Sequence, residues 1–171
     1  MIRSSVVVDG DGRTRLCPSK VDLQSQGLTE FPSELCDPLR AGTLRELNLT
    51  YNHLTTLPDS IGALVGLKTL ILEGNQLTAL PDAIGALVGL TELRLKGNQL
   101  TTLPESIATL TALEIMKLDS NALTTLPDSI VALTALKTLA IHQNRLAKPQ
   151  SPAVEAWLEA LESEGCRVFR D

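Results

Sequence analysis

Aromatic residues are scarce in this chain of 171 residues: two Phe, one Trp and one Tyr make up 2% of it. A core of this size usually contains several large rings, so the 43% of apolar residues must fill the interior with smaller side chains. No apolar run approaches the roughly 18 residues that a membrane-spanning helix needs. The first residues, MIRSSVVVDGDG, are too few and too acidic for the apolar part of a signal peptide. We therefore expect no membrane partner.

Blocks of basic residues are absent as well. Fifteen Lys and Arg residues stand against 20 Asp and Glu residues, a formal net charge of −5. A general electrostatic grip on nucleic acid is therefore not expected. The cysteines, Cys17, Cys36 and Cys166, are odd in number and form no CxxC pair, which is typical of free thiols in a cytosolic protein. The sequence thus predicts a cytoplasmic monomer.

Leucine, in contrast, is abundant: the chain has 33, and 26 of them lie between Leu44 and Leu146. Five leucines recur at intervals of 23 residues: Leu44, Leu67, Leu90, Leu113 and Leu136. The segments that begin there follow the pattern LxxLxLxxNxLxxLPxxIxxLxx, and the fifth stops half way. An earlier copy, VDLQSQGLTEFPSELCDPLRAGT, fits when three extra residues are allowed before Leu44. We therefore predict about six repeats over residues 18–148.

Each fixed position of the pattern has a physical reason. The alternation in LxLxx predicts a short strand with one buried face, and the strands of successive copies should pair in parallel. The Asn at the ninth position can donate and accept, so a column of Asn can satisfy backbone groups in the turn after each strand. Proline keeps the leucine before it out of helical geometry. The Ile and Leu that follow should return to the core from a short helical or 3₁₀ turn.

The copies must stack, because one copy buries too little apolar surface to offset its own backbone entropy. Strands are narrow and the turns opposite them are bulkier, so the stack should curve with its sheet on the concave side.

These residues resemble the leucine-rich repeat family, specifically the 23-residue class with LPxxIxxL that occurs in Ras-suppressor-like proteins, plant intracellular Ras-group proteins and many bacterial proteins. The resemblance covers residues 18 to about 146. It implies an α/β fold, a right-handed horseshoe solenoid whose concave parallel sheet usually binds another protein. The sequence departs from the family pattern in the first copy and in the last, where Pro149 stands at the place of the usual leucine.

Both ends of a solenoid need covers. Residues 1–17 read as a strand, a DG turn and a second strand, which predicts a β-hairpin cap on the first repeat. Residues 149–171 predict a cap helix that starts after Ser151 and ends at Gly165, followed by a short closing strand. Trp157 falls on the apolar side of this helix, so we expect it to seal the last repeat rather than to stack on a ligand.

The outward strand positions predict a binding surface for a protein partner. Ile71 and Ile115 are apolar on an otherwise polar face, and Arg94 and Lys117 lie between and beside them, which is the composition of a contact patch. The seventh position adds a row of alternating charge, which either joins the contact or only keeps the sheet soluble. The predicted partner-binding residues are Tyr51, Ile71, Glu73, Arg94, Lys96, Ile115, Lys117, Asp119 and His142.

Candidate chemistry elsewhere is weaker. The segment VVVDGDGRT, with Asp9 and Asp11, resembles the nucleophile motif of haloacid-dehalogenase-type phosphotransferases, but Arg13 stands where that family has Thr or Val, so a turn is the favoured interpretation. The same residues do not fit an EF-hand calcium loop. His53 and His142 lie four repeats apart and cannot share a metal. We therefore predict no catalytic residue, no cofactor and no metal site.

For two further features, we favour a structural interpretation over a functional one. Cys166 has no His near it in sequence that could make it a nucleophile. A row of carboxylates follows the prolines and suits the free N–H groups at the start of the convex turns better than a cation. These carboxylates are Asp59, Asp82, Glu105 and Asp128.

The favoured function is a non-enzymatic protein-recognition module, such as a scaffold or adaptor. The first alternative is a host-directed effector or binding protein exported without a classical signal. The second alternative is an enzyme that uses the N-terminal DxD.

Overall fold

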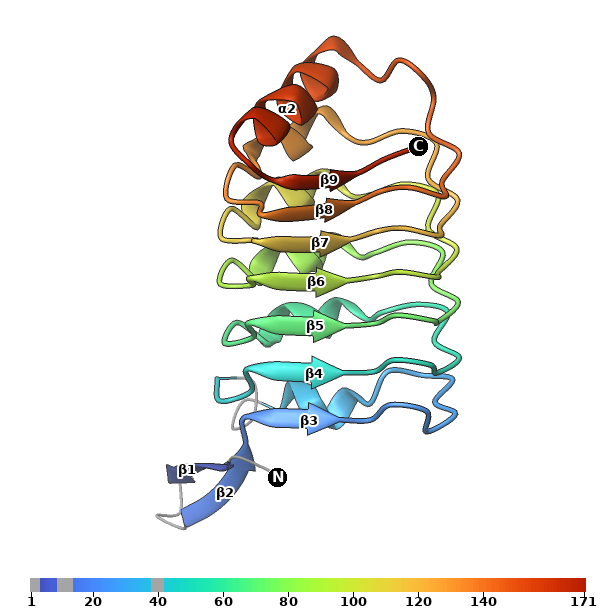
Figure 1. The fold of residues 1–171 in the computed structure, drawn as a ribbon. Helices are drawn as coiled ribbons and strands as arrows, with labels where there is room; N and C mark the ends of the chain where they lie inside the picture. The colour runs from blue at the N-terminus through green and yellow to red at the C-terminus, as the bar shows by residue number, and fades with distance from the viewer. Residues whose placement is uncertain (1–3, 9–13, 38–41) are drawn as a thin grey trace.

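The computed structural model describes residues 4–8, 14–37 and 42–171, which form two separate sheets and a C-terminal helix (Figure 1). Strands β1 (Ser4–Val8) and β2 (Thr14–Pro18) pair antiparallel in a two-stranded sheet. The other seven strands form one open parallel sheet, in which each strand pairs with the next along the chain. They are β3 (Lys20–Asp22), β4 (Glu46–Asn48), β5 (Thr69–Ile71), β6 (Glu92–Arg94), β7 (Ile115–Lys117), β8 (Thr138–Ala140) and β9 (Arg167–Phe169).

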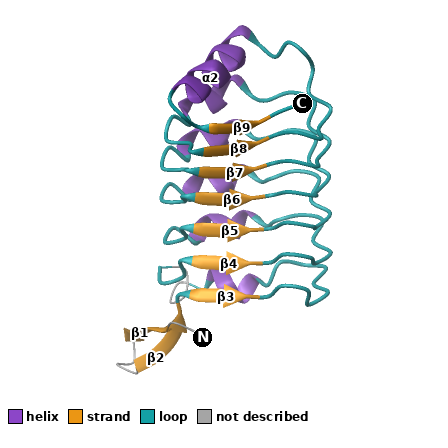
Figure 2. Cartoon of the chain, viewed as in Figure 1, coloured by secondary structure: helices purple, strands orange, loops and turns teal. Residues whose placement is uncertain are grey.

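Each repeat returns to the next strand through a short 3₁₀ helix, as the sequence predicts. In every copy a proline precedes the helix in an extended conformation, for example Pro58 with φ −75° and ψ 157°, and directs the chain across to the side opposite the strands (Figure 2). The five helices are η1 (Ser33–Cys36), η2 (Asp59–Ala63), η3 (Asp82–Ala86), η4 (Glu105–Thr109) and η5 (Asp128–Ala132).

A single leucine-rich core runs between the sheet and the 3₁₀ helices. The central residue of each inner strand, such as Leu70 or Leu93, is fully buried, and so is the isoleucine of the facing helix, such as Ile84. The first copy is the exception, since Val21 and Leu23 are only partly buried. Stacking therefore supplies the burial that one copy lacks, and it is incomplete where a copy has a neighbour on one side only.

The predicted asparagine column is confirmed. Nδ2 of Asn98 donates to the carbonyl oxygens of Leu72 and Leu95, each at 2.9 Å, and its Oδ1 accepts the N–H of Leu77 at 3.0 Å. One side chain thus satisfies backbone groups of two successive repeats. The same bridge recurs at Asn52, Asn75, Asn121 and Asn144.

The C-terminal segment contains the helix and the strand that the sequence predicts. Helix α2 (Pro152–Ser163) begins after Ser151, whose Oγ accepts the N–H of Val154 at 3.3 Å. Gly165, with φ +89°, follows the helix and turns the chain into β9, which pairs in parallel with β8. Helix α2 packs against η5 and β9. Trp157 is buried there, and its Nε1 donates to the carbonyl of Leu133 at 3.3 Å.

The N-terminal hairpin is confirmed as a pair of antiparallel strands. It forms its own sheet and, in Figure 1, extends away from the N-terminal end of the solenoid. Its function as a cap on the first repeat stays a prediction. The predicted turn between the strands, with Asp9, Asp11 and Arg13, lies outside the described residues.

Candidate functional site

The parallel register places equal repeat positions side by side across the sheet. In each inner strand the central residue is buried and its two neighbours face outward, half-buried except for Ala140. We call these outward residues, with the seventh repeat position beyond each strand, the sheet face. The third positions are Lys20, Glu46, Thr69, Glu92, Ile115, Thr138 and Arg167, and the fifth are Asp22, Asn48, Ile71, Arg94, Lys117, Ala140 and Phe169. The parallel pairing of successive copies that the sequence predicts is therefore confirmed, whereas the role of these residues in binding stays a prediction.

Two ion pairs lie among these positions. Lys20 Nζ lies 2.5 Å from Glu46 Oε1 on the neighbouring strand, and this hydrogen bond and charge raise the pKa of Lys20. Arg94 places both Nε and Nη2 2.5 Å from Oε1 of Glu92, two residues earlier on the same strand. The Arg94 guanidinium is thus already engaged within the sheet face.

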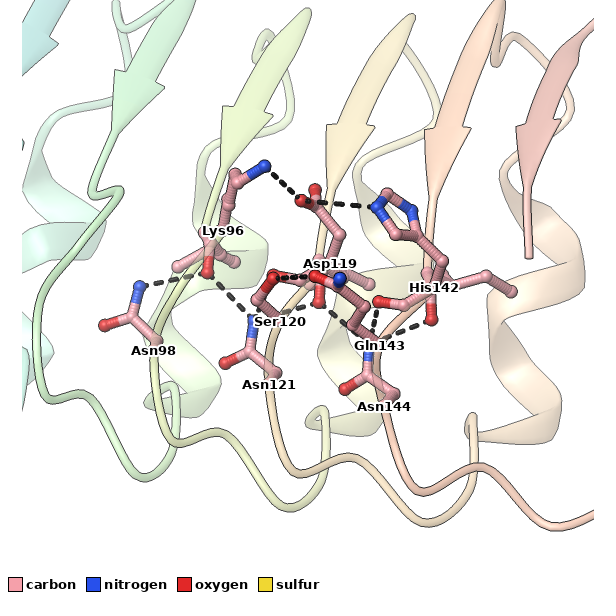
Figure 3. A network of polar contacts seen from close by, with 11 residues as sticks. Lys96, Asn98, Asp119, Ser120, Asn121, His142, Gln143 and Asn144 are labelled. Atoms are coloured by element: carbon pink, nitrogen blue, oxygen red, sulfur yellow. Dashed lines mark hydrogen bonds and ion pairs between the residues drawn. The ribbon is translucent and has the colours of Figure 1, made fainter. Parts of the chain in front are cut away.

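The seventh position is less exposed than alternation predicts. Lys96 Nζ lies 2.8 Å from Oδ2 of Asp119, and Nε2 of His142 lies 3.9 Å from the same oxygen (Figure 3). The Asp119 side chain is only 3% exposed, against 53% for Lys96. The hydrogen bond and the charge of Asp119 raise the pKa of Lys96. Asp119 is therefore a buried anchor for two neighbours, and the expectation that it lies open in a solvated row is wrong.

Glu73, the other member of that predicted row, takes part in no ion pair within the described part of the chain. The hydrogen bond and charge of Asp119 raise the pKa of Lys96 and the charge of Glu73 adds to this, so the three charges alternate although only Lys96 and Asp119 form an ion pair.

The eighth position forms a column of left-handed backbone along one edge of the sheet face. Tyr51 has φ +53° and is 63% exposed, and the next two copies have Gly74 and Gly97 at this place. The Tyr51 ring lies over Gly74, since a Cβ on Gly74 would come 2.4 Å from Tyr51 Cδ1. Further along the column, Ser120 Oγ donates to Gln143 Oε1 at 2.6 Å. Tyr51 is thus held as an exposed aromatic group at the rim.

The apolar part of the sheet face differs in one respect from the prediction. Ile71 and Ile115 are half-buried, as expected for apolar groups on a polar sheet. Ala140 is buried, whereas Phe169 beside it on β9 is 51% exposed. Phe169 is not among the predicted partner-binding residues, because the sequence pattern indicates only that the closing strand covers the end of the core.

The remaining sequence candidates do not converge on a second site. The convex carboxylates lie in the first turns of η2 to η5, at the N-terminal helix ends that the sequence predicts for them. Burial raises the pKa of the Cys166 thiol. His53 is exposed and lies four repeats away from His142. Within residues 4–8, 14–37 and 42–171, no three His, Cys, Asp or Glu side chains are grouped as metal ligands, and no helix is long and apolar enough to cross a membrane.

A pocket of about 310 Å³ lies off the sheet face, where α2 meets the turn after β8. Leu146 forms part of its apolar wall, and Lys148 and Arg170 line it. Lys148 Nζ donates to the main-chain oxygen of Asp171 at 2.7 Å, and Arg170 pairs with Glu162 at 3.1 Å. Both cations are therefore used to hold the C-terminal residues in place.

Comparison with known proteins gives a consistent family assignment. A family profile for the leucine rich repeat matches residues 20–77, 42–100 and 88–146. A search of curated proteins finds no match.

Three solved structures illustrate the similarity. The repeat ectodomain of the plant receptor kinase GASSHO1/SCHENGEN3 from Arabidopsis thaliana, in complex with Casparian strip integrity factor 2, is 31% identical with a TM-score of 0.71 over 88% of this chain. A leucine-rich repeat protein of Leptospira interrogans is 25% identical with a TM-score of 0.54 over 88% of this chain. The Arabidopsis thaliana SOBIR1 ectodomain, 20% identical with a TM-score of 0.63 over 99% of this chain and 78% of its own, shows the same fold. The chain spans 18% of the first of these proteins and 53% of the second.

Proposed function

Because this chain belongs to the leucine-rich repeat family, we propose that it is a protein-recognition module that binds its partner through the sheet face and performs no chemistry of its own. The observation that carries this proposal is that the sheet face has apolar side chains that do not belong to the leucine core. Half-buried Ile71 and Ile115 lie among ion pairs on a sheet whose opposite face holds the leucines. Apolar groups set among charged ones are typical of protein contacts.

The plant receptor ectodomain supports the proposal by analogy. Its structure is a complex with Casparian strip integrity factor 2, and this chain shares both its fold and 31% of its aligned residues. We extend to this chain only the general activity, which is recognition of another protein by the repeats.

The size of the sheet face sets a limit on the contact. Seven strands at about 4.8 Å spacing give a width of ~29 Å, and positions three to seven span ~13 Å along the chain. The resulting area, on the order of 400–550 Å² with side chains, is below the ~800 Å² per partner of a standard interface. Residues beyond the sheet face, such as Tyr51 with 63% exposure, therefore have to join the contact, or the contact is weak, or this chain contributes part of a longer surface.

In this proposal the chain acts as a scaffold or adaptor in the cytoplasm, the compartment that an odd number of cysteines without a CxxC pair favours. It binds as a monomer, and its specificity comes from the sheet face rather than from a cofactor.

The test is capture of a partner from cell lysate, followed by affinity measurement with variants. The Ile71→Ala/Arg94→Ala double variant should weaken binding at least tenfold, because it removes an apolar contact and a guanidinium from the centre of the sheet face. The control Val65→Ala/Arg145→Ala changes a β-branched aliphatic residue and an arginine at exposed positions outside the sheet face and should bind normally. Circular dichroism should show that both variants are folded.

Unchanged affinity of the Ile71→Ala/Arg94→Ala variant would refute binding through this face. Phosphatase and peptidase assays on the purified wild-type chain address the enzymatic alternative directly, and turnover above a denatured control would contradict the non-enzymatic proposal.

A further inference from the structure

The charges on the sheet face are paired unevenly along the solenoid. Lys20, Arg94 and Lys96 each have a carboxylate partner within 2.8 Å. Lys117 on β7 and Arg167 on β9 have no ion-pair partner among the described residues. Both lie in the C-terminal half of the sheet, which leaves this half with an unsatisfied positive charge.

The N-terminal half carries the opposite surplus. Within the described chain, Asp22 on β3 and Glu73 after β5 have no cation paired with them. Asp22 Oδ1 accepts hydrogen bonds only from neutral donors, the N–H of Gln24 and Nδ2 of Asn48. The sheet face is therefore polarised along the solenoid axis, negative toward β3 and positive toward β9.

Exposed or half-exposed apolar groups accompany the two free cations. Phe169 follows Arg167 by two residues on the same face of β9 and is 51% exposed. Ile115 precedes Lys117 by two residues on β7 and is half-buried. We call these four residues the C-terminal patch. Asp171 lies just beyond β9, where its Oδ2 accepts the N–H of Gln143 at 2.8 Å, and it forms no ion pair with Lys117 or Arg167.

We propose that the C-terminal patch binds an acidic segment of the partner protein that also carries an apolar side chain. This inference rests on the proposed function and specifies the chemistry of the partner. Covering Lys117 and Arg167 with a neutral surface would desolvate two cations without compensation, so the partner has to supply carboxylates. Phe169 provides the aromatic anchor that tight contacts favour.

The spacing of the cations defines a pattern for that segment. Lys117 and Arg167 are two strands apart, about 9.6 Å, and two residues apart along the strand direction, about 6.6 Å, so their Cα atoms are separated by ~12 Å. In an extended segment, residues four apart face the same way and are separated by ~13 Å. Two acidic residues at this interval can therefore reach both cations. The residue midway between them also faces the sheet, near Phe169, and should be apolar.

The unpaired carboxylates of Asp22 and Glu73 disfavour binding of an acidic segment to the N-terminal half of the sheet face. An acidic segment placed across β3 to β5 would meet negative charge there, which is unfavourable. The same segment is attracted to the patch on β7 to β9. The acidic segment should therefore bind one half of the sheet face only.

The test is selection of peptides from a random 12-residue display library on the full chain, followed by affinity measurements on the enriched sequences. We expect enrichment of the pattern acid–x–apolar–x–acid. The double variant Lys117→Glu/Arg167→Glu should lower the affinity at least tenfold. Replacement of both acids in the peptide by Lys should restore binding to this variant. The matched control Arg145→Glu, a charge reversal outside the sheet face, should change the affinity less than twofold.

Each other outcome contradicts the inference. Enriched peptides that are neutral or basic, no enrichment, or unchanged affinity for the Lys117→Glu/Arg167→Glu variant would each overturn the acidic-segment proposal. The proposed function fails separately: if selected peptides lose affinity for Ile71→Ala/Arg94→Ala but not for the patch variant, the sheet face is the binding surface and only the acidic preference is wrong. If neither variant changes the affinity, both proposals fall.

Discussion

Replacement of Asn98 by Ala tests the asparagine column most directly. Asn98 is 7% exposed and makes three hydrogen bonds to backbone groups. The carbonyls of Leu72 and Leu95 each keep a second donor after the substitution, Nδ2 of Asn75 and Nδ2 of Asn121. The N–H of Leu77, in contrast, has Asn98 as its only partner among the described residues. The variant therefore loses two shared bonds and leaves one buried donor unsatisfied.

These losses set the magnitude. Two hydrogen bonds at about 1 kcal/mol each and one buried N–H without a partner at about 1–3 kcal/mol give a loss of about 3–5 kcal/mol in the free energy of unfolding. With a urea m-value of about 2 kcal/mol/M, the midpoint should fall by ~1.5–2.5 M. The fluorescence of Trp157 and far-UV circular dichroism report the transition.

The neighbouring position supplies the control. Gln99 is exposed and its side chain makes no hydrogen bond within the described chain, so Gln99→Ala should change the stability by less than about 0.5 kcal/mol. Asn98→Asp keeps an acceptor for Leu77 but turns a carboxylate toward two carbonyl oxygens. Near neutral pH, Asn98→Asp should therefore lower the free energy of unfolding more than Asn98→Ala does. This loss of stability should become smaller as the pH falls and the carboxylate takes up a proton. Asn98→Ala with wild-type stability would refute the reasoning.

Two further substitutions test the rim and the charge pair. Gly97→Ala should cost about 1–2 kcal/mol, because φ is +67° while the new methyl group has room, and Gly74→Ala should cost more because its methyl group meets the Tyr51 ring. In thermal unfolding, the additional loss of stability of Gly74→Ala over Gly97→Ala should disappear when Tyr51 is also replaced by Ala. If this additional loss persists without the Tyr51 ring, the contact between the ring and residue 74 is not its cause. Asp119 raises the pKa of Lys96 above 10.5, so the pair stabilises the fold below that pH and its contribution is lost as the pH rises through the raised pKa. In urea titrations, Lys96→Met should thus be less stable than wild type at neutral pH and equally stable at high pH. A loss of stability that does not depend on pH would contradict a stabilising Lys96–Asp119 ion pair.

The interval of 23 residues was sufficient to predict most of the fold. Once the copies stack, the environment of each repeated position is determined: Leu70 is buried in its strand, and Asn98 is hydrogen-bonded to two repeats. Strand register followed from the same interval, because parallel strands of equal copies align equal positions.

The environment of individual sheet-face residues was harder to predict. Alternation assigns Asp119 to the same face as Lys96, but its burial depends on side chains from two neighbouring copies, Lys96 and His142. Phe169 follows its partner Ala140 by 29 residues, since α2 interrupts the period, so no repeat count could align it. Both are tertiary effects between segments.

Tyr51 did leave a signal in the sequence. The next two copies have Gly at the equivalent eighth position, and a glycine that recurs where a strand meets a turn indicates left-handed backbone. Comparing copies for such glycines would have predicted the φ of +53° that holds Tyr51 at the rim.

The strict parallel register also bears on how such a chain can evolve. Because each inner strand pairs only with the copies before and after it, gaining or losing a whole 23-residue unit preserves every ladder. One unit inserted between Glu73 and Lys117 would move the acidic and basic ends of the sheet apart by about 4.8 Å. Duplication of a repeat can therefore lengthen the partner segment that the sheet face contacts, while the charged residues at both ends of the sheet stay unchanged.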